Sequence, residues 1–378
     1  MKRNNKAKAG GPAFSALLLA AALYSCELPG TEAAPENTAS ISIMTWNLQA
    51  LFDGTESGTE YDEYTAAADW SEEKYKGRIN VISKAIQKME SGMPDIIALE
   101  EIESGKVLED IGASLLDDGE MWTHFAGNPD SALGLGLISR FPFESVRVHS
   151  INADGGVAPR PVLEARISAG GGPLALFVCH WKSKLGGDDA TEAARRASAR
   201  IILRRLRELA EEDTSLPAII MGDLNENYDE FYRRNGSVIS ALIPDDPRCA
   251  NVTGFYSLDE EDPAAAALAA GMQKDFIILS KNKPPLARYF PKQAFCVYSP
   301  WAKELENGSY YYRNEWETID HFLLSAQFFD GTGWEFENAQ VLNQLPFGNA
   351  NGHPSAYNPR TGAGLSDHLP LLLFLAVR

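Results

Sequence analysis

Short apolar runs alternate with amphipathic stretches along the chain after residue 40. Runs of Ile, Leu, Val and Phe with the length of buried strands predict β-structure, and longer stretches with helical spacing predict helices. The predicted strands are Ile41–Asn47, Asp95–Glu100, Leu133–Ser139, Val162–Ile167, Leu174–His180, Ala218–Asp223, Thr318–Ser325 and Leu369–Val377. The predicted helices are Tyr75–Met89 and Ala193–Leu209. This alternation indicates a mixed α/β domain.

One turn separates two of the predicted strands. Gly170, Gly171 and Gly172 lie between Val162–Ile167 and Leu174–His180, which is typical of a tight antiparallel hairpin. The sheet is therefore not purely parallel, and a simple doubly wound fold is disfavoured.

The N-terminus has the pattern of a secretion signal. Lys2, Arg3, Lys6 and Lys8 precede the apolar run Ala13–Tyr24, which is too short to span a bilayer. Leu23-Tyr24-Ser25-Cys26 resembles a bacterial lipobox, so we expect cleavage before Cys26 and lipidation of its thiol; ordinary export with a free Cys26 stays open.

The expected organisation is a signal peptide at residues 1–25, a lipidated Cys26 with a flexible tether to residue 40, and one catalytic domain at residues 41–378. We expect an exported, membrane-anchored lipoprotein in the periplasm or at the cell surface, monomeric in its folded part. Of the remaining cysteines, Cys179 lies in an apolar run and is expected to pack as a buried hydrophobe, whereas Cys249 and Cys296 are expected to form a disulfide.

Composition and charge exclude two classes of protein. The chain has 378 residues with 44% hydrophobic residues, which is enough for a sizeable core and excludes a disordered tail. Its 52 acidic against 34 basic residues give a net charge of −18, and loss of the four basic residues of the signal would give −22. Such a surface repels phosphate, which excludes a general nucleic-acid coat but not an enzyme that meets phosphate at one metal-charged spot.

Polar residues gather at the ends of six predicted segments. These clusters are Thr45-Trp46-Asn47, Glu100-Glu101, His180-Trp181-Lys182-Ser183, Gly222-Asp223-Leu224-Asn225, Ile319-Asp320-His321 and Ser366-Asp367-His368-Leu369-Pro370. A single Asx residue at a strand end is usually a turn former. Sites of α/β proteins are assembled where strands end, so the whole set predicts one functional site.

Four carboxylates in one site require a compensating cation. Glu101, Asp223, Asp320 and Asp367 cannot all ionise in a low dielectric without one. Oxygen donors without a Cys/His cluster favour Mg²⁺, with Mn²⁺ or Ca²⁺ as alternatives. Strand alternation places Asp320 and His321 on opposite faces, so His321 is expected to be structural.

In this order, the six motifs resemble the endonuclease/exonuclease/phosphatase superfamily, from about Ile43 to the end of the chain. The resemblance implies a four-layer sandwich of two mixed β-sheets flanked by helices. The implied metal ligands are Asn47, Glu101 and Asp367. The implied catalytic residues are His180 and Asn225 for the phosphate, Asp223 for the attacking water or the metal, and the pair Asp320–His368 as an oriented acid/base. Whether Asp223 or His368 is the base, and whether one metal or two operate, stays open.

One position departs from the family pattern. The family usually carries Gln before the metal-binding Glu, whereas this chain has Glu100. On a regular strand Glu100 points away from Glu101, so we expect a solvated or paired side chain; turned inward, it would be a fifth carboxylate.

Several cations are candidate phosphate contacts, and two loops are candidate specificity elements. The candidate contacts are Arg78, Arg160, Lys182 and Arg195. The arginine-rich helix Ala193–Leu209 is more simply a charged face paired with neighbouring acids. We expect the long segments Asp53–Trp70 and Tyr228–Tyr312, both rich in aromatics, to determine the substrate.

Three functions compete at this point. The first is an exported endonuclease that cleaves DNA or RNA. The second is a phosphoesterase that acts on a phospholipid or an inositol phosphate. The third is a surface lipoprotein that only binds a partner, which the presence of every catalytic residue type disfavours.

Overall fold

The computed structural model describes residues 39–116, 121–128, 131–151, 160–236, 238–252, 275–288 and 295–378. These residues belong to one compact unit, Thr38–Arg378. The predicted signal segment, Cys26 and the tether up to residue 38 lie outside the described residues. Among the helices that are described, none combines the length and apolarity that a membrane span requires.

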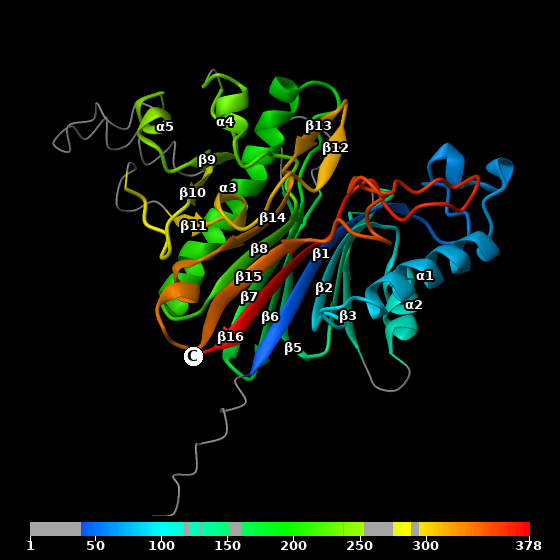
Figure 1. Ribbon diagram of the computed structural model, residues 1–378, viewed down its shortest axis with the longest axis horizontal. Helices are drawn as coiled ribbons and strands as arrows, with labels where there is room; N and C mark the ends of the chain where they lie inside the picture. The colour runs from blue at the N-terminus through cyan, green and yellow to red at the C-terminus, as the bar shows by residue number, and fades with distance from the viewer. Residues whose placement is uncertain are drawn as a thin grey trace, which may run out of the picture. The chain divides into compact units, whose positions relative to one another are not determined.

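Two large sheets and one small sheet are formed by the described strands (Figure 1). The six-stranded sheet has the order β15 (Trp334–Val341), β16 (Leu371–Val377), β1 (Ser40–Leu51), β2 (Ile96–Ile102), β4 (Gly134–Ser139) and β3 (Trp122–Ala126). The eight-stranded sheet has the order β5 (Phe143–His149), β6 (Val162–Ala169), β7 (Gly172–His180), β8 (Ala218–Asp223), β14 (Asp320–Leu324), β11 (Cys296–Tyr298), β10 (Ile277–Ser280) and β9 (Leu242–Pro244). Strands β12 (Tyr310–Tyr312) and β13 (Glu315–Glu317) form a separate hairpin.

The helices are short apart from three. They are α1 (Glu72–Gln87), α2 (Gly105–Leu115), α3 (Asp188–Glu212), α4 (Glu230–Arg233) and α5 (Pro247–Val252), with 3-10 turns at Asp62–Tyr64, Ala66–Ala68, Pro300–Ala302 and Ala326–Phe329. Helices α1 and α2 begin after Ser71 and Ser104, whose side chains accept hydrogen bonds from backbone N–H groups of the first turn.

The described core has three large apolar layers and a small cluster around Phe231 and Phe276. The central layer joins the two sheets face to face through side chains such as Ile43, Leu137, Val178 and Phe322. A second layer lies between the six-stranded sheet and helices α1 and α2, and a third between the eight-stranded sheet and α3. Figure 1 shows α1 and α2 on one side of the sheets and α3 on the other. The predicted four-layer sandwich of two mixed sheets flanked by helices is confirmed.

Strand pairing confirms the predicted hairpin and also joins the two ends of the described chain. Strands β6 and β7 are antiparallel, with Ala169 opposite Gly172 across the glycine turn. Strand β16 lies between β15 and β1 and is antiparallel to both. The first and last described strands are therefore direct neighbours, and the segment before β16 comes close to the end of β1.

The predicted disulfide between Cys249 and Cys296 is wrong: no bond joins these two described residues. The thiol of Cys249 is directed instead at the Tyr232 hydroxyl, with 3.4 Å between Sγ and Oη. Cys179 is fully buried in the apolar layer beside α3, as expected.

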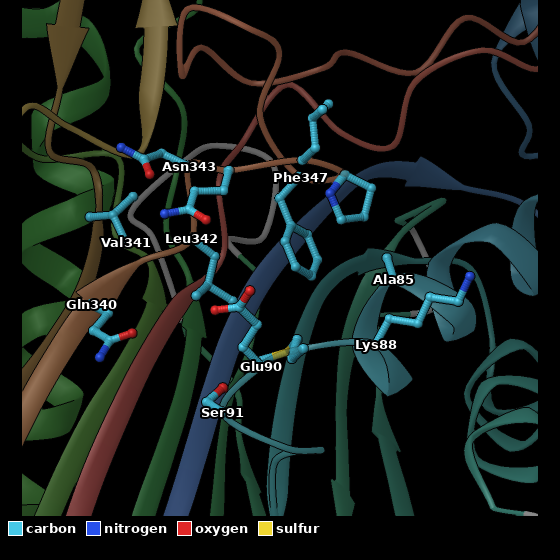
Figure 2. Close-up of a pocket in the computed structure, with 13 residues that line it drawn as sticks. Ala85, Lys88, Glu90, Ser91, Gln340, Val341, Leu342, Asn343 and Phe347 are labelled. Carbon is cyan, nitrogen blue, oxygen red and sulfur yellow. The ribbon is translucent and has the colours of Figure 1, made fainter.

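A cavity of about 260 Å³ lies between the end of α1 and the segment that follows β15 (Figure 2). Its lining includes Lys88, Glu90, Asn343 and Phe347. No predicted catalytic or metal-binding residue contributes to this lining.

Candidate active site

The predicted site residues meet where strands of both sheets end. Strands β1 and β2 are parallel neighbours, so Asn47 and Glu101 come to the same edge of one sheet. In the other sheet His180 of β7 and Asp320 of β14 are the register partners of Asp223 on either side. The segment before β16 adds Asp367 and His368.

Asp223 is the centre of this arrangement and is only 2% exposed. Its Oδ2 accepts a hydrogen bond from Asn47 Nδ2 at 3.0 Å, which joins the two sheets, and its Oδ1 accepts from the backbone N–H of Asn225 at 2.9 Å. The Nε2 atoms of His180 and His368 lie 3.4 and 4.0 Å from Oδ2. One carboxylate therefore contacts or faces four groups, three of which come from other segments of the chain.

Burial raises the pKa of Asp223 to about 7, with a further rise from Asp320 and an opposing effect of His368. A carboxyl group with a pKa near neutrality has the affinity for protons that a general base requires.

Asp320 and His368 form a buried pair with a third member. Asp320 Oδ2 lies 2.8 Å from His368 Nδ1 and also accepts a hydrogen bond from Ser309 Oγ at 2.5 Å. Burial disfavours the charged imidazole, but Asp320, Asp367 and Asp223 overcome this effect, and the pKa of His368 stands well above its ordinary value. His368 is therefore held as an oriented imidazolium. Sequence reasoning missed Ser309, since it belongs to none of the six motifs.

Glu101 and Asp367 are the carboxylates nearest to solvent. Their side chains are 22% and 35% exposed, and Glu101 Oε2 accepts a hydrogen bond from the backbone N–H of Ala50 at 2.8 Å. Burial raises the pKa of Asp367, and the charge of Glu101 raises it further. This mutual repulsion fits a site that holds a divalent cation.

The donor set is suited to a hard metal ion. Asn47, Glu101 and Asp367 offer amide and carboxylate oxygens, the ligand types that Mg²⁺ and similar ions prefer. A second group, Asp223, Asp320 and His368, has ligand atoms within 4.8 Å of one another. Asn47, Glu101 and Asp367 therefore stay the predicted ligands of a metal at the solvent side, and Asp223 belongs to the group whose ligand atoms lie close together.

Glu100 was expected to be either solvated or paired, and the first of these two expectations is wrong. Glu100 is completely buried, and its Oε1 accepts a hydrogen bond from Thr45 Oγ1 at 2.9 Å. Regular alternation accounts for this burial: Ile96 and Ala98 of β2 lie in the layer between the two sheets, and Glu100 is on the same face of the strand. The left-handed φ of 60° at Glu101 and the register shift to β4 come only after Glu100. Burial, together with the charge of Asp320, raises the pKa of Glu100 well above its ordinary value. The fifth carboxyl group is therefore present, and its surroundings disfavour its charged form.

His180 and Asn225 lie beside Asp223. Burial lowers the pKa of His180 well below its ordinary value, and the charges of Arg160, His368 and Lys182 act in the same direction. Its Nδ1 has no hydrogen-bond partner among the described residues. Asn225 has a φ of 51° and donates from Nδ2 to the Trp181 carbonyl at 3.2 Å. A neutral imidazole and an amide are thus available near the carboxylates as hydrogen-bond donors.

Two of the four cations expected to contact substrate are buried and bind groups inside the protein instead. The Arg78 guanidinium is buried and donates to the carbonyls of Leu48, Gln49 and Ala50. It therefore fixes the segment that follows Asn47.

Arg195 is likewise fully buried, where it pairs with Glu226 and, at 2.9 Å, with Glu192. A buried guanidinium cannot contact substrate, so both predictions are wrong. They failed because a helical pattern does not reveal which arginines point inward. Arg160 and Lys182 lie close enough to His180 for their charges to lower its pKa, and substrate contact by these two residues stays a prediction.

Two other arginines of α3 pair with acids, and His321 is structural, as expected. Arg196 pairs with Asp275 at 2.8 Å, and Arg205 pairs with Glu164 at 2.9 Å. His321 lies 2.8 Å from the Glu226 carbonyl through Nε2, and burial lowers its pKa to about 4. It is a neutral structural residue on the face opposite Asp320.

Comparison with known proteins gives a consistent result. A family model described as "Endonuclease/Exonuclease/phosphatase family" matches residues 42–268. No curated protein matches the sequence significantly.

Solved structures are similar in fold at low identity. Truncated TDP2 from Caenorhabditis elegans has a TM-score of 0.50 and 12% identity, and the match covers 89% of this chain and 98% of TDP2. An endonuclease/exonuclease/phosphatase family protein from Bacteroides thetaiotaomicron has a TM-score of 0.49 and 14% identity over 90% of this chain and 99% of its own. The mannosyl-6-phosphatase Bt3783 of the same organism has a TM-score of 0.49 and 14% identity, with 89% and 99% covered.

Proposed function

This chain belongs to the endonuclease/exonuclease/phosphatase family, whose members are phosphoester hydrolases, and from that premise we propose that it is a metal-dependent endonuclease of DNA or RNA. The observation that carries the proposal is the surrounding of Asp223. Asn47 from the opposite sheet, Asn225, His180 and His368 all lie within 4.0 Å of its carboxylate oxygens. Such an arrangement of acid, base and amide groups around one buried carboxylate is suited to in-line attack of water on a phosphodiester.

The metal has a defined place in the proposal. Asn47, Glu101 and Asp367 would hold Mg²⁺, or Mn²⁺ or Ca²⁺ in its place, and such a cation supplies positive charge that offsets the charge of the phosphate. Without that charge the phosphate would meet a cluster of carboxylates.

The chain's own residues divide the proton transfers. Asp223 takes a proton from the attacking water, as its pKa near 7 allows. His368, charged and oriented by Asp320, gives a proton to the leaving oxygen; with the roles exchanged, His368 would be the base and Asp223 a metal ligand. His180, which is neutral, donates a hydrogen bond from Nε2 to a phosphate oxygen. Asn225 steadies a second oxygen.

A second candidate, a phospholipid phosphoesterase, has one observation in its favour. Leu185 is 84% exposed in the loop that follows His180, where an apolar tip is suited to entering a lipid surface. Nucleic acid is the preferred substrate because the cations Arg160 and Lys182 lie beside His180, and a chain of phosphates can meet both.

One assay compares the candidates. The purified chain is incubated with plasmid DNA, RNA, sphingomyelin or phosphoinositides, with Mg²⁺ or with EDTA, and Asp223→Asn serves as the inactive control. We expect nicked plasmid or shortened RNA with Mg²⁺ only. Release of a headgroup or phosphate without nucleic-acid cleavage selects the lipid candidate, and inactivity on every substrate selects the binding lipoprotein.

We also propose that the protein is exported and anchored through Cys26. The motif Leu23-Tyr24-Ser25-Cys26 supports this proposal. In a bacterial host fed labelled palmitate, the wild type is expected to carry label in the membrane fraction. Cys26→Ala is expected to lose the label, and a labelled Cys26→Ala protein would contradict the anchor.

A further inference from the structure

The β12–β13 hairpin presents its aromatic residues on two faces. Its turn residues Arg313 and Asn314 have φ values of 50° and 67°, the left-handed pair of a two-residue hairpin turn. Because strand residues alternate between faces, Tyr310 and Tyr312 share one face and Tyr311 lies on the other.

The Tyr311 face anchors the hairpin. The Tyr311 ring stacks on His353 with 3.9 Å between centroids and contacts Trp316 edge to face at 5.0 Å. At the base of the hairpin, Ser309 O accepts a hydrogen bond from the backbone N–H of Leu369 at 2.7 Å, and Tyr310 forms a backbone bridge with His368. The hairpin is therefore fixed directly beside the catalytic histidine.

The opposite face of the hairpin carries Tyr310 and Tyr312, whose rings extend from His368 to solvent. The Tyr310 ring covers the His368 imidazole with 4.6 Å between centroids and 35° between planes. The Tyr312 ring follows, 6.1 Å from Tyr310 and nearly parallel to it at 21°. Tyr312 is 48% exposed, so one ring at the end of this series is accessible.

We propose that Tyr312 is a stacking subsite for a nucleobase that flanks the scissile phosphate. The inference rests on the proposed nuclease function and specifies how such a substrate is recognised. Aromatic faces stack on any base with little sequence preference, so the subsite would recognise an unpaired nucleotide and not a particular sequence. The Arg313 guanidinium lies over the Tyr312 ring, with 5.0 Å between Cζ and the ring centroid. A base that stacks on this face would therefore also stack on the guanidinium plane or displace it.

Two carboxylates against the one guanidinium of Arg313 make the net charge beside the tyrosine rings negative, which favours a neutral ring over a second phosphate. Glu317 is the cross-strand partner of Tyr310, and Glu315 is the partner of Tyr312. These carboxylates repel an anionic group placed over the tyrosine rings, whereas an uncharged base is tolerated. A sugar bearing several phosphates or an anionic headgroup is thereby disfavoured at this position.

Binding without turnover tests the subsite separately from catalysis. Fluorescence anisotropy in the inactive Asp223→Asn background, with Mg²⁺ present, compares a labelled single-stranded oligothymidine with a strand of equal length that carries abasic spacers. The variants are Tyr312→Ala and Tyr312→Phe, which keeps the ring. Trp122→Ala is the matched control, because Trp122 is 44% exposed and pairs with Ser139, opposite the start of β2 and far from its Glu101 end.

We expect Tyr312→Ala to weaken binding of the base-containing strand roughly 5- to 150-fold, the range of one base–aromatic stack, and to leave the abasic strand unchanged. Tyr312→Phe and Trp122→Ala should bind as the wild type does. Equal loss on both strands, or no loss on either, overturns the inference.

Cleavage with Mg²⁺ separates the two proposals. Base-dependent binding through Tyr312 without any nucleic-acid cleavage supports the subsite and refutes the nuclease. Cleavage that proceeds equally on abasic and base-containing strands, with no effect of Tyr312→Ala, refutes the subsite and leaves the nuclease standing. A Tyr312→Ala defect confined to hydrolysis of a sugar phosphate also overturns the nucleobase assignment.

Discussion

Replacement of Glu100 by Gln tests the neutral carboxyl group beneath the active site. Glu100 is fully buried between the sheets and is held by Thr45, and its Oε2 has no hydrogen-bond partner among the described residues. Gln has the same shape and keeps an oxygen acceptor for Thr45, but it has no proton to lose. The variant should therefore differ from the wild type chiefly in how its stability depends on pH.

The sign and size of the expected stability difference follow from the linkage between proton binding and folding. The pKa of Glu100 is raised in the folded protein from an ordinary value of 4.5, mainly by burial. Well below pH 4.5 the carboxyl is protonated in both the folded and the unfolded state, so it adds no pH dependence to the free energy of unfolding. As the pH rises from 4.5 toward the raised folded value, the unfolded chain loses the proton and the folded chain keeps it. The free energy of unfolding then falls by about 1.4 kcal/mol per pH unit from this group alone, a fall that the Gln variant lacks.

Guanidinium unfolding in EDTA between pH 5.5 and 7.5, followed by tryptophan fluorescence, measures this difference. We expect the stability of Glu100→Gln relative to wild type to rise by up to about 1.4 kcal/mol per pH unit, whatever its value at the acid end. The exposed Glu90→Gln controls for loss of one charge and should parallel the wild type. Parallel profiles for Glu100→Gln and wild type would refute the buried neutral carboxyl.

Three further predictions concern catalysis, packing and charge. Asp223→Asn should lower kcat by ~10²–10⁴-fold with little change in KM on a verified substrate, and near-wild-type turnover would contradict its role. Arg195→Met should cost ~3–5 kcal/mol in denaturant unfolding, because Glu192 and Glu226 lose a buried partner; a raised KM with unchanged stability would instead favour substrate contact. Activity on plasmid should rise from very low to moderate ionic strength as salt screens the net charge of −18, whereas a steady fall would indicate a basic docking surface.

The sequence predicted the central strands well because they are buried on both faces. The runs that became β7, β8 and β16 are almost continuously apolar, and their observed ends lie within about two residues of the predicted ones. Strand β5 was missed because most of its residues are partly or fully exposed, so no apolar run marks it. Helix α2 was missed as well, although its inward face carries Val107, Leu108 and Ile111.

In the candidate site, too, some features followed from the sequence pattern and others did not. Strand ends predicted which residue types would gather, and the alternation at Asp320 and His321 was correct. Glu100 lies on the face of β2 that also carries Ile96 and Ala98, and it is buried because the second sheet covers this face, which alternation within one strand does not reveal. Burial of Arg195 depends on where Glu226 lies, at a separation of 31 residues that no local pattern records.

The position of β16 has a consequence for the timing of activity during synthesis. Asp367 and His368 precede this strand, the Trp46 indole donates to the His368 carbonyl at 3.0 Å, and β16 pairs with β1. A growing chain therefore presents Asn47, Glu101 and Asp223 long before it contains the residues that complete the site. Contacts of such long sequence separation form late in folding. On the proposed mechanism a nascent or truncated chain would be catalytically silent, and hydrolysis would begin only when the last strand has been inserted beside the first.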